Sequence, residues 1–267
     1  MAINRLAAAL ILLLAFAFGC TIPQNPQAGL KYFEIVHEKA NCPDGGCFTE
    51  YLFVSSGVVL KKQYNLPNYI GEPTMELRRM KNGESALFFD TAEKVSDANK
   101  NFTGSGDAKN HIFFSDNSNL YSLSFPNNLP AQFLEIFKEA EREFDAASPD
   151  VDFYVHQYYQ PLTGDSVDFH IFSDGTFIRS VFTSDSNTLK DSKIYLLSEN
   201  DVTVLANMAG NITRRSNAPN AGCKADAGLV YGYVEIKQDG KYVGTYTCGN
   251  ENDGISAIFA FLKNKYG

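Results

Sequence analysis

The sequence lacks an excess of basic residues. Its 267 residues include 23 Lys and Arg against 31 Asp and Glu, which gives a formal net charge of −8. A surface of this sign disfavours nucleic acid, and it disfavours electrostatic attachment to anionic lipid headgroups. The acidic residues are spread through the chain, so we interpret the net charge as a solvated surface and expect no nucleic-acid partner.

Sequence signatures of catalysis and of cofactor binding are also lacking. No glycine-rich phosphate-binding motif is present, and Gly104–Gly106 lies in a polar loop, not at the strand-to-helix turn that exposes a serine nucleophile. Segments 116–119 and 250–254 contain oxygen ligands, but they lack the spacing of an EF-hand and are interpreted as turns. We therefore predict no catalytic residue and no cofactor.

One long apolar run is present, near the start of the chain. Residues 6–19 follow a single basic residue, Arg5, and would span roughly 21 Å as a helix, which is less than the ~30 Å hydrocarbon core of a bilayer. A short basic start, an apolar run and small residues before a cleavage site are typical of a secretion signal. No second run approaches eighteen apolar residues, so we expect no other membrane span.

The segment Ala17-Phe18-Gly19-Cys20 resembles the lipobox of prokaryotic membrane lipoproteins. The resemblance covers only the first twenty residues, and it implies that the bond before Cys20 is cleaved and that Cys20 is lipid-modified as the mature N-terminus. Lipid attachment contributes roughly 0.8 kcal/mol per buried methylene, so two or more chains hold a protein stably at a membrane.

The expected location is therefore the cell membrane, with a lipid anchor and the folded part outside the cytoplasm. Residues 1–20 are then the signal sequence, and residues 21–29 are a flexible tether with two prolines and no charge. An uncleaved hydrophobic anchor and an ordinary signal cleaved elsewhere are the alternatives.

Four cysteines remain beyond Cys20. An even number of cysteines after a secretion signal favours disulfides, and pairing within each half of the chain is the simplest of three connectivities. A metal site is the alternative, but residues 42–47 have neither zinc-knuckle spacing nor a neighbouring histidine. The predicted disulfide cysteines are Cys42, Cys47, Cys223 and Cys248.

One order of elements occurs twice along the chain. Alternating apolar residues predict strands, Ser-Gly and Asp-Gly predict hairpin turns, and apolar residues three or four apart predict helices. Strands are expected at 31–38, 49–57, 58–62, 112–114 and 120–125, and again at 152–159, 167–175, 176–180, 230–236 and 242–247. Helices are expected at 80–89 and after Pro130, and at 197–206 and near the C-terminus.

The predicted fold class is therefore α+β, with two tandem related units at residues 30–148 and 149–267. Each unit is expected to be an antiparallel sheet of about five strands with two helices, in the order β-β-β-α-β-β-α. Ser198 followed by Asp201 resembles a capping box. The expected buried helix faces include Val202, Leu205 and Met208; Phe133, Ile136, Phe137, Ala140 and Phe144; and Ile255, Ile258, Phe259, Leu262 and Tyr266.

Two histidines are weak candidates for a metal site. If the turn after residues 152–159 is centred on Thr163, His156 and His170 face each other across the hairpin, with Tyr154 and Asp168 on the same face. Two imidazoles and a carboxylate suit a transition metal.

A cation is expected to oppose that metal site, because the Asp174-Gly175 turn is predicted to place Arg179 beside His170. An exposed face or a packing face between the two units is therefore the favoured interpretation. No metal site is predicted.

Two long polar loops, residues 96–110 and 210–228, occupy equivalent places in the two halves. Loops longer than about 12 residues are often functional, so these are candidate binding segments. Arg214 and Arg215 form a basic doublet, which either faces an acidic partner or is a solvated tip. Asn101 and Asn211 begin sequons and are possible glycosylation sites.

The function expected from the sequence is that of a membrane-anchored extracytoplasmic module that binds a protein, a peptide or an envelope component. A hydrolase is the alternative from another class, because catalytic groups can meet in space without a motif in sequence. A structural role in the cell envelope is the third. A polar pocket with convergent histidines and carboxylates would favour the enzyme, whereas flat aromatic surfaces rimmed by loops would favour binding.

Overall fold

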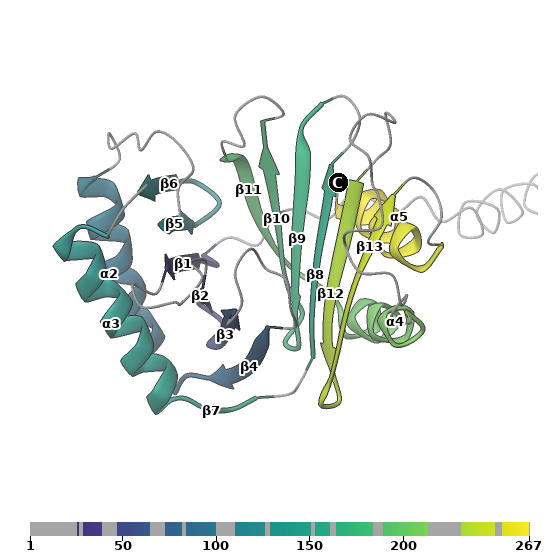
Figure 1. Cartoon of the computed structure of the whole chain (residues 1–267), viewed down its shortest axis with the longest axis horizontal. Coiled ribbons are helices and arrows are strands. Elements are labelled where there is room, and N and C mark those ends of the chain that lie inside the picture. Colours follow the sequence, from purple (N-terminus) through teal and green to yellow (C-terminus); the bar gives the residue numbers. More distant parts are fainter. Residues whose placement is uncertain are drawn as a thin grey trace, which may run out of the picture.

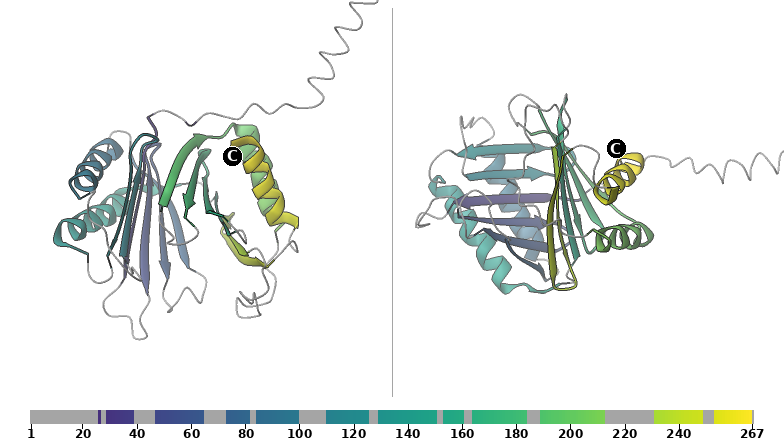
Figure 2. Two further views of the ribbon diagram at one scale, coloured as in Figure 1. Left: turned by 90° about the horizontal axis from the view of Figure 1, so that it is seen from above. Right: turned by 45° about the vertical axis from the view of Figure 1, so that its right-hand side comes forward.

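Two antiparallel sheets and four helices make up the part of the chain that the computed structural model describes, which confirms the α+β class. The described residues are Pro26 and 29–38, 47–64, 73–81, 84–99, 110–125, 129–150, 153–160, 164–183, 189–212, 231–248 and 253–266. The two sheets lie face to face with a helix pair outside each, so the layers run helix, sheet, sheet, helix (Figures 1 and 2).

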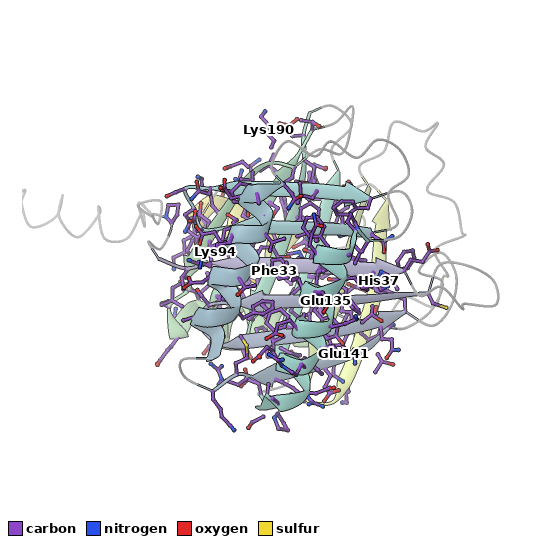
Figure 3. The ribbon with its side chains drawn as sticks, turned by 90° about the vertical axis from the view of Figure 1, so that its left-hand side faces the viewer. Phe33, His37, Lys94, Glu135, Glu141 and Lys190 are labelled. Carbon is purple, nitrogen blue, oxygen red and sulfur yellow. The ribbon has the colours of Figure 1, made fainter. Side chains whose placement is uncertain are left out.

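The first sheet, called sheet A, has seven strands in the order β6-β5-β1-β2-β3-β4-β7. Helices α2 (Glu84–Ala98) and α3 (Ala131–Ala146) cover its outer face, and Figure 3 looks onto these helices with the strands behind them. The strands are β1 (Tyr32–Glu38), β2 (Phe48–Val54), β3 (Val58–Tyr64), β4 (Thr74–Arg79), β5 (Asn110–Ser115), β6 (Leu120–Phe125) and β7 (Ser148–Pro149).

The second sheet, called sheet B, has six strands in the order β11-β10-β9-β8-β12-β13. Helices α4 (Glu199–Gly210) and α5 (Asp253–Tyr266) cover its outer face. The strands are β8 (Phe153–Gln160), β9 (Ser166–Phe172), β10 (Thr176–Phe182), β11 (Leu189–Leu196), β12 (Tyr231–Gln238) and β13 (Lys241–Cys248). Its strands run crosswise to those of sheet A (Figure 2).

The outer face of each sheet is apolar because alternate residues of its strands are aromatic or branched and point the same way. Phe33 and Phe53 of sheet A pack against Phe88 of α2, with ring centroids 5.4 and 4.3 Å away. In sheet B, Val155 and Ile171 lie in one buried cluster with residues of α4 and α5. Burial of these faces holds each helix pair on its sheet.

The inner faces of the two sheets share a third apolar cluster. Sheet A contributes Tyr32, Leu52, Val54, Val58, Leu60, Met75 and Leu77, and sheet B contributes Tyr154, Phe172, Ile178 and Ile194. These side chains are all buried. The two sheets therefore have a common core, which joins the two halves of the chain.

A turn of sheet A also reaches the edge of sheet B. Asn117, between β5 and β6, has a positive φ of 68°. Its side-chain carbonyl accepts a hydrogen bond from the Ile194 N–H at 2.7 Å, and its amide nitrogen donates to the Ile194 carbonyl at 3.2 Å. Both backbone groups of a residue in the edge strand β11 are thereby satisfied.

The two sheets have the same strand order when β1–β6 are matched to β8–β13, since β6-β5-β1-β2-β3-β4 then corresponds to β13-β12-β8-β9-β10-β11. A detail of the turns agrees with this match. Gly57 and Gly175 follow β2 and β9 with φ of 101° and 85°. The carbonyl of each accepts a hydrogen bond from the first residue after the fourth strand, Met80 or Leu197.

The sheets have seven and six strands where about five were expected in each. The additional strands β4 and β11 precede the first helix of each half, and β7 pairs with β4 through Arg78 and Arg79. Strand β4 was missed because its alternation rests on only two apolar residues, Met75 and Leu77, among charged residues that favour helices. The expected unit boundary after Ser148 falls within β7.

The helices agree with the sequence in their buried faces more closely than in their ends. Helix α2 begins at Glu84 instead of residue 80 and continues to Ala98. In α3 the predicted face is confirmed, with Phe137 only partly buried and the others buried, namely Phe133, Ile136, Ala140 and Phe144. In α5 the described side chains Ile258, Leu262 and Tyr266 are buried and Phe259 is partly buried. None of the helices in the described ranges is long and apolar enough to cross a membrane.

The predicted cap of α4 is confirmed, and it extends into a tie between α4 and α5. The Ser198 hydroxyl accepts a hydrogen bond from the Asp201 N–H at 3.2 Å. The Asp201 carboxylate accepts from Lys265 at 2.6 Å and from the Tyr266 hydroxyl at 2.7 Å. Burial alone would raise the pKa of Asp201, but the hydrogen bonds from Lys265, Tyr266 and Ser198 outweigh burial and lower it.

We predict that Gly175→Ala destabilises the protein more than Gly240→Ala. Both glycines have positive φ, at 85° and 75°, so either alanine costs about 1 kcal/mol of backbone strain. A Cβ on residue 175 would also lie 2.9 Å from the Leu197 carbonyl oxygen, whereas one on residue 240 meets nothing within 4 Å. Overpacking should add about 1–3 kcal/mol to the loss at position 175, measured by denaturant unfolding. Equal losses would contradict the close approach of β11 to this turn.

We predict that stability falls in acid partly through Asp201. A carboxyl group whose pKa is lowered by folding stabilises the protein above its unfolded pKa of about 3.9, and this contribution is lost as pH falls through the folded pKa. Asp201→Asn should therefore flatten the acid side of the stability profile, measured by thermal melts below about pH 5. Glu199→Gln, in the same helical turn but exposed, is the control and should leave the slope unchanged.

Candidate functional site

Ionisable side chains gather on the inner faces of the two sheets, beside the shared apolar cluster. Strand alternation places them there, because each follows or precedes a residue that points toward the helices. We call this set the inter-sheet cluster. It consists of Glu34, Glu50 and Lys62 from sheet A and of His156, Asp168, His170 and Glu235 from sheet B, with most of these side chains buried.

The two candidate histidines face each other as predicted. His156 of β8 is the register partner of His170 of β9, and their rings stack with centroids 4.4 Å apart and planes 9° from parallel. Both rings contact one carboxylate: the distances are 2.7 Å from His156 Nε2 to Asp168 Oδ1 and 3.5 Å from His170 Nε2 to Asp168 Oδ2. Three potential ligands therefore meet at one point between the strands.

The opposite edges of the two imidazoles are also fixed. His156 Nδ1 lies 2.9 Å from Glu235 Oε2 of the neighbouring strand β12. His170 Nδ1 shares a hydrogen bond of 2.7 Å with the Tyr154 hydroxyl. Each ring thus directs Nε2 toward Asp168 and Nδ1 toward another partner, which sets the orientation of both rings.

The predicted position of Arg179 was wrong. His170 pairs with Ile178, and Arg179 pairs with Phe169. The turn after β9 has three residues and ends on Gly175, so the register differs by one residue from the one expected, and such a shift places a side chain on the other face. Arg179 instead lies 3.7 Å from Asp191, and the expected cation beside His170 is not there.

Lys62 is the cation of the inter-sheet cluster, and its side chain is only 1% exposed. It extends from β3 of sheet A to sheet B, where Nζ donates to Glu235 Oε2 at 3.2 Å. The same nitrogen lies 3.4 Å from Glu50 Oε1 and 5.1 Å from the centroid of the Tyr154 ring. Its ammonium group is therefore paired with a carboxylate from each sheet.

Tyrosines and a third histidine contact the carboxylates of Glu235 and Glu34. Glu235 Oε1 accepts from the hydroxyls of Tyr64 at 3.2 Å and Tyr242 at 3.1 Å. Glu34 is bonded to the Tyr32 hydroxyl, and its Oε1 lies 3.0 Å from His111 Nε2. These contacts extend the polar network across both sheets.

Burial and pairing oppose each other in the pKa values of this cluster. Burial favours the neutral form of each group, yet Lys62 and His156 lower the pKa of Glu235, and His156 and His170 lower that of Asp168, well below the ordinary range. Burial would lower the pKa of His156, but Asp168 and Glu235 raise it to about 9. The pKa of Lys62 is raised because its negative partners outweigh burial. Burial raises the pKa of Glu50. Asp168, Glu235, His156 and Lys62 are therefore charged near neutral pH.

Several predicted site residues lie outside the described residues. These are Cys20, Cys42, Asn101, Arg214, Arg215 and Cys223, together with positions 100–109 and 213–228 of the two loops. Ser96 to Ala98, expected in the first loop, belong to α2. Asn211 is exposed after α4, where its amide nitrogen donates to the Asn207 carbonyl at 2.9 Å.

Two of the four predicted disulfide cysteines, Cys47 and Cys248, lie within the described residues. Cys47 is buried just before β2 and is disulfide-bonded. Cys248 is the last residue of β13. The predicted pairing of the four cysteines stays a prediction.

The sequence did not single out Lys62, Glu50 or Glu235 as site residues. One signal was available, because Glu235 alternates with Val234 and Ile236 and must point to the face opposite those apolar residues. That face could be recognised as buried only if the packing of the two sheets were known.

No model of a known protein family matches the chain. The curated proteins contain no match to it either.

We predict that Lys62→Met destabilises the protein strongly, whereas Lys61→Met does not. Removing the Lys62 ammonium breaks its buried pairs with Glu50 and Glu235 and leaves Glu235 with His156 as its cationic partner; breaking a buried pair typically costs about 3–5 kcal/mol. The neighbouring Lys61 stacks over Tyr51 and Phe144 at 5.4 Å and should contribute less than about 1 kcal/mol. Denaturant unfolding measures both, and similar losses would show that Lys62 is not specifically paired.

Proposed function

We propose that this chain is a lipid-anchored extracytoplasmic module that binds a protein, a peptide or an envelope component. The observation that carries the proposal is the lipobox-like segment ending at Cys20, which follows a single apolar run too short for a membrane span. Residues 21–29 then form the tether to the folded part. The disulfide at Cys47 supports an oxidising compartment, where such bonds persist.

In this proposal, the folded part consists of two related units that share one core. Their common strand order and the corresponding hydrogen bonds of Gly57 and Gly175 support the relationship. Glu34 and Leu52 are register partners in sheet A, as His156 and His170 are in sheet B. Leu52 and His170 precede Gly57 and Gly175 by the same number of residues, and so do Glu50 and Asp168. Glu34, Glu50 and Leu52 therefore correspond in position to His156, Asp168 and His170. The cores of both units meet in the shared apolar cluster.

The fold leaves particular parts of the module for recognition. Helices cover the outer faces of the sheets, and the inner faces cover each other. A partner is therefore recognised through helix surfaces, strand edges or loops, and we assign this role to the two long loops. Both connect to central parts of the fold, since the strands that follow them, β5 and β12, pair with β1 and β8.

One observation favours the hydrolase as a second candidate. Histidines and carboxylates converge in the inter-sheet cluster, and such convergence is typical of hydrolase active sites. Their burial limits this candidate, because His156 and His170 are 6% and 4% exposed and a substrate would have to reach them past Asp168.

We predict that Cys20→Ala abolishes lipid attachment and leaves an uncut precursor or a released protein. The thiol of Cys20 is the atom that the lipid would modify, so fatty-acid labelling should be lost in the variant and present in the wild type. Cys248→Ala is the control for a cysteine that is not in the lipobox-like segment. Labelling of Cys20→Ala at the wild-type level would refute the anchor.

The binding function is tested by crosslinking the full-length chain in intact cells and identifying what it captures. A partner that crosslinks reproducibly to wild type, and is lost when Arg214 and Arg215 are both changed to Ser, supports recognition through the loops. Turnover of a substrate that is lost in Asp168→Asn would instead support the hydrolase and overturn the binding module.

A further inference from the structure

We propose that His156, His170 and Asp168 form a binding site for one divalent transition-metal ion of the Zn²⁺ class. One ligand atom from each of the three residues lies within 4.8 Å of the others. This inference does not depend on the lipid anchor or on a macromolecular partner. It goes beyond the proposed function by assigning an inorganic ligand to the inter-sheet cluster.

Two of the three ligand distances are already near those of a zinc site, and the stacked rings would have to tilt toward the ion. Zinc binds nitrogen and carboxylate oxygen at about 2.0–2.2 Å, so ligand atoms around a tetrahedral ion lie about 3.3 Å apart. His156 Nε2 is already 2.7 Å and His170 Nε2 3.5 Å from the nearest Asp168 oxygen. The ion would enter between the two Nε2 atoms and the carboxylate, and the proton that His156 Nε2 holds against Asp168 would pass to solvent.

The surrounding groups are those that hold histidine ligands in metal sites. A metal-bound imidazole usually donates its second N–H to a carboxylate, a carbonyl or another oxygen, which fixes the tautomer and the ring orientation. His156 has Glu235 in this position at 2.9 Å, and His170 has the Tyr154 hydroxyl at 2.7 Å. Both Nε2 atoms are thereby directed to the same side.

The charges of the inter-sheet cluster also favour a cation. The cluster contains four carboxylates, Glu34, Glu50, Asp168 and Glu235, and one lysine, Lys62, which is paired with Glu50 and Glu235. Once His156 has released its proton, the four carboxylates outweigh Lys62 by three negative charges, and a divalent ion would neutralise two of them. The Lys62 ammonium lies on the other side of the His156 ring from the proposed ion, because its Nζ is 3.3 Å from Nδ1 and the ion would bind Nε2.

The partial exposure of Asp168 gives the ion a route to the site. Its side chain is 17% exposed, whereas those of His156 and His170 are 7% and 5% exposed. Three protein ligands and one solvent-facing side match the coordination of zinc sites that keep a position for water. We therefore assign water or a small anion to the fourth position.

The test is titration of the untagged, metal-free, full-length chain in detergent with Zn²⁺ by calorimetry, and with Co²⁺ by visible absorption. We expect one ion per chain, and Co²⁺ absorption typical of a four- or five-coordinate nitrogen and oxygen site. Asp168→Asn and His170→Gln should each weaken binding more than 100-fold, since even residues behind the ligands contribute about 10–100-fold. Glu235→Gln should fall in that smaller range.

His37→Gln is the matched control. His37 lies on the helix-covered side of sheet A (Figure 3). Its ring packs 4.9 Å from that of Phe137 of α3, so its loss removes a histidine without touching the proposed site. The His37→Gln variant should bind Zn²⁺ with the affinity of the wild type. Zn²⁺ should also raise the melting temperature of the wild type and of His37→Gln, but not of the two ligand variants, whose folded state is checked by circular dichroism.

The proposal is overturned if the wild-type chain shows no stoichiometric binding, or if the ligand variants bind as tightly as His37→Gln. If a ligand variant fails to fold, the proposal is still tested, because the stoichiometry of Zn²⁺ binding and the Co²⁺ spectrum are both measured on the wild-type chain. Cys20→Ala should bind Zn²⁺ normally, so failure of the lipid anchor and failure of the metal site are separate results.

Discussion

The packing of the two sheets depends on one buried cation. The Lys62 ammonium, on β3 of sheet A, cannot remain unpaired in the interior, and it finds Glu50 in its own sheet and Glu235 in the other. A buried ion pair contributes little to net stability, but it penalises any arrangement in which a partner is missing. Apolar burial between the sheets is not directional, whereas these contacts require particular partner atoms. We infer that the pair selects the relative position of the sheets.

Much of the fold followed from local sequence, and the errors have local causes. The pairing of His156 with His170 was predictable because strict alternation and one turn determine a hairpin register. The cap at Ser198 was predictable because it needs only residues three apart. Arg179 was misplaced because one additional turn residue reverses the face. The contact between Lys62 and Glu235 joins residues 173 apart, and no local pattern contains it.

The two sheets carry different side chains at corresponding positions of the inter-sheet cluster. Glu34 and Glu50 of sheet A occupy the positions that His156 and Asp168 occupy in sheet B, and Leu52 stands where His170 does. Sheet A therefore supplies Glu34, Glu50 and Lys62 to the cluster, while sheet B supplies the two stacked imidazoles together with Asp168 and Glu235. If the two sheets derive from one duplicated unit, as proposed above, such a division would let one copy keep packing residues while the other acquires ligands.

The contact of Asn117 with Ile194 has a consequence for association between molecules. Strand β11 is at the edge of sheet B, and an edge with unpaired backbone groups is a template for pairing with another chain. The amide of Asn117 engages the N–H and the carbonyl of Ile194 as a neighbouring strand would. A single side chain from the turn between β5 and β6 thus occupies this position of the edge, and another chain could pair with β11 there only by displacing Asn117.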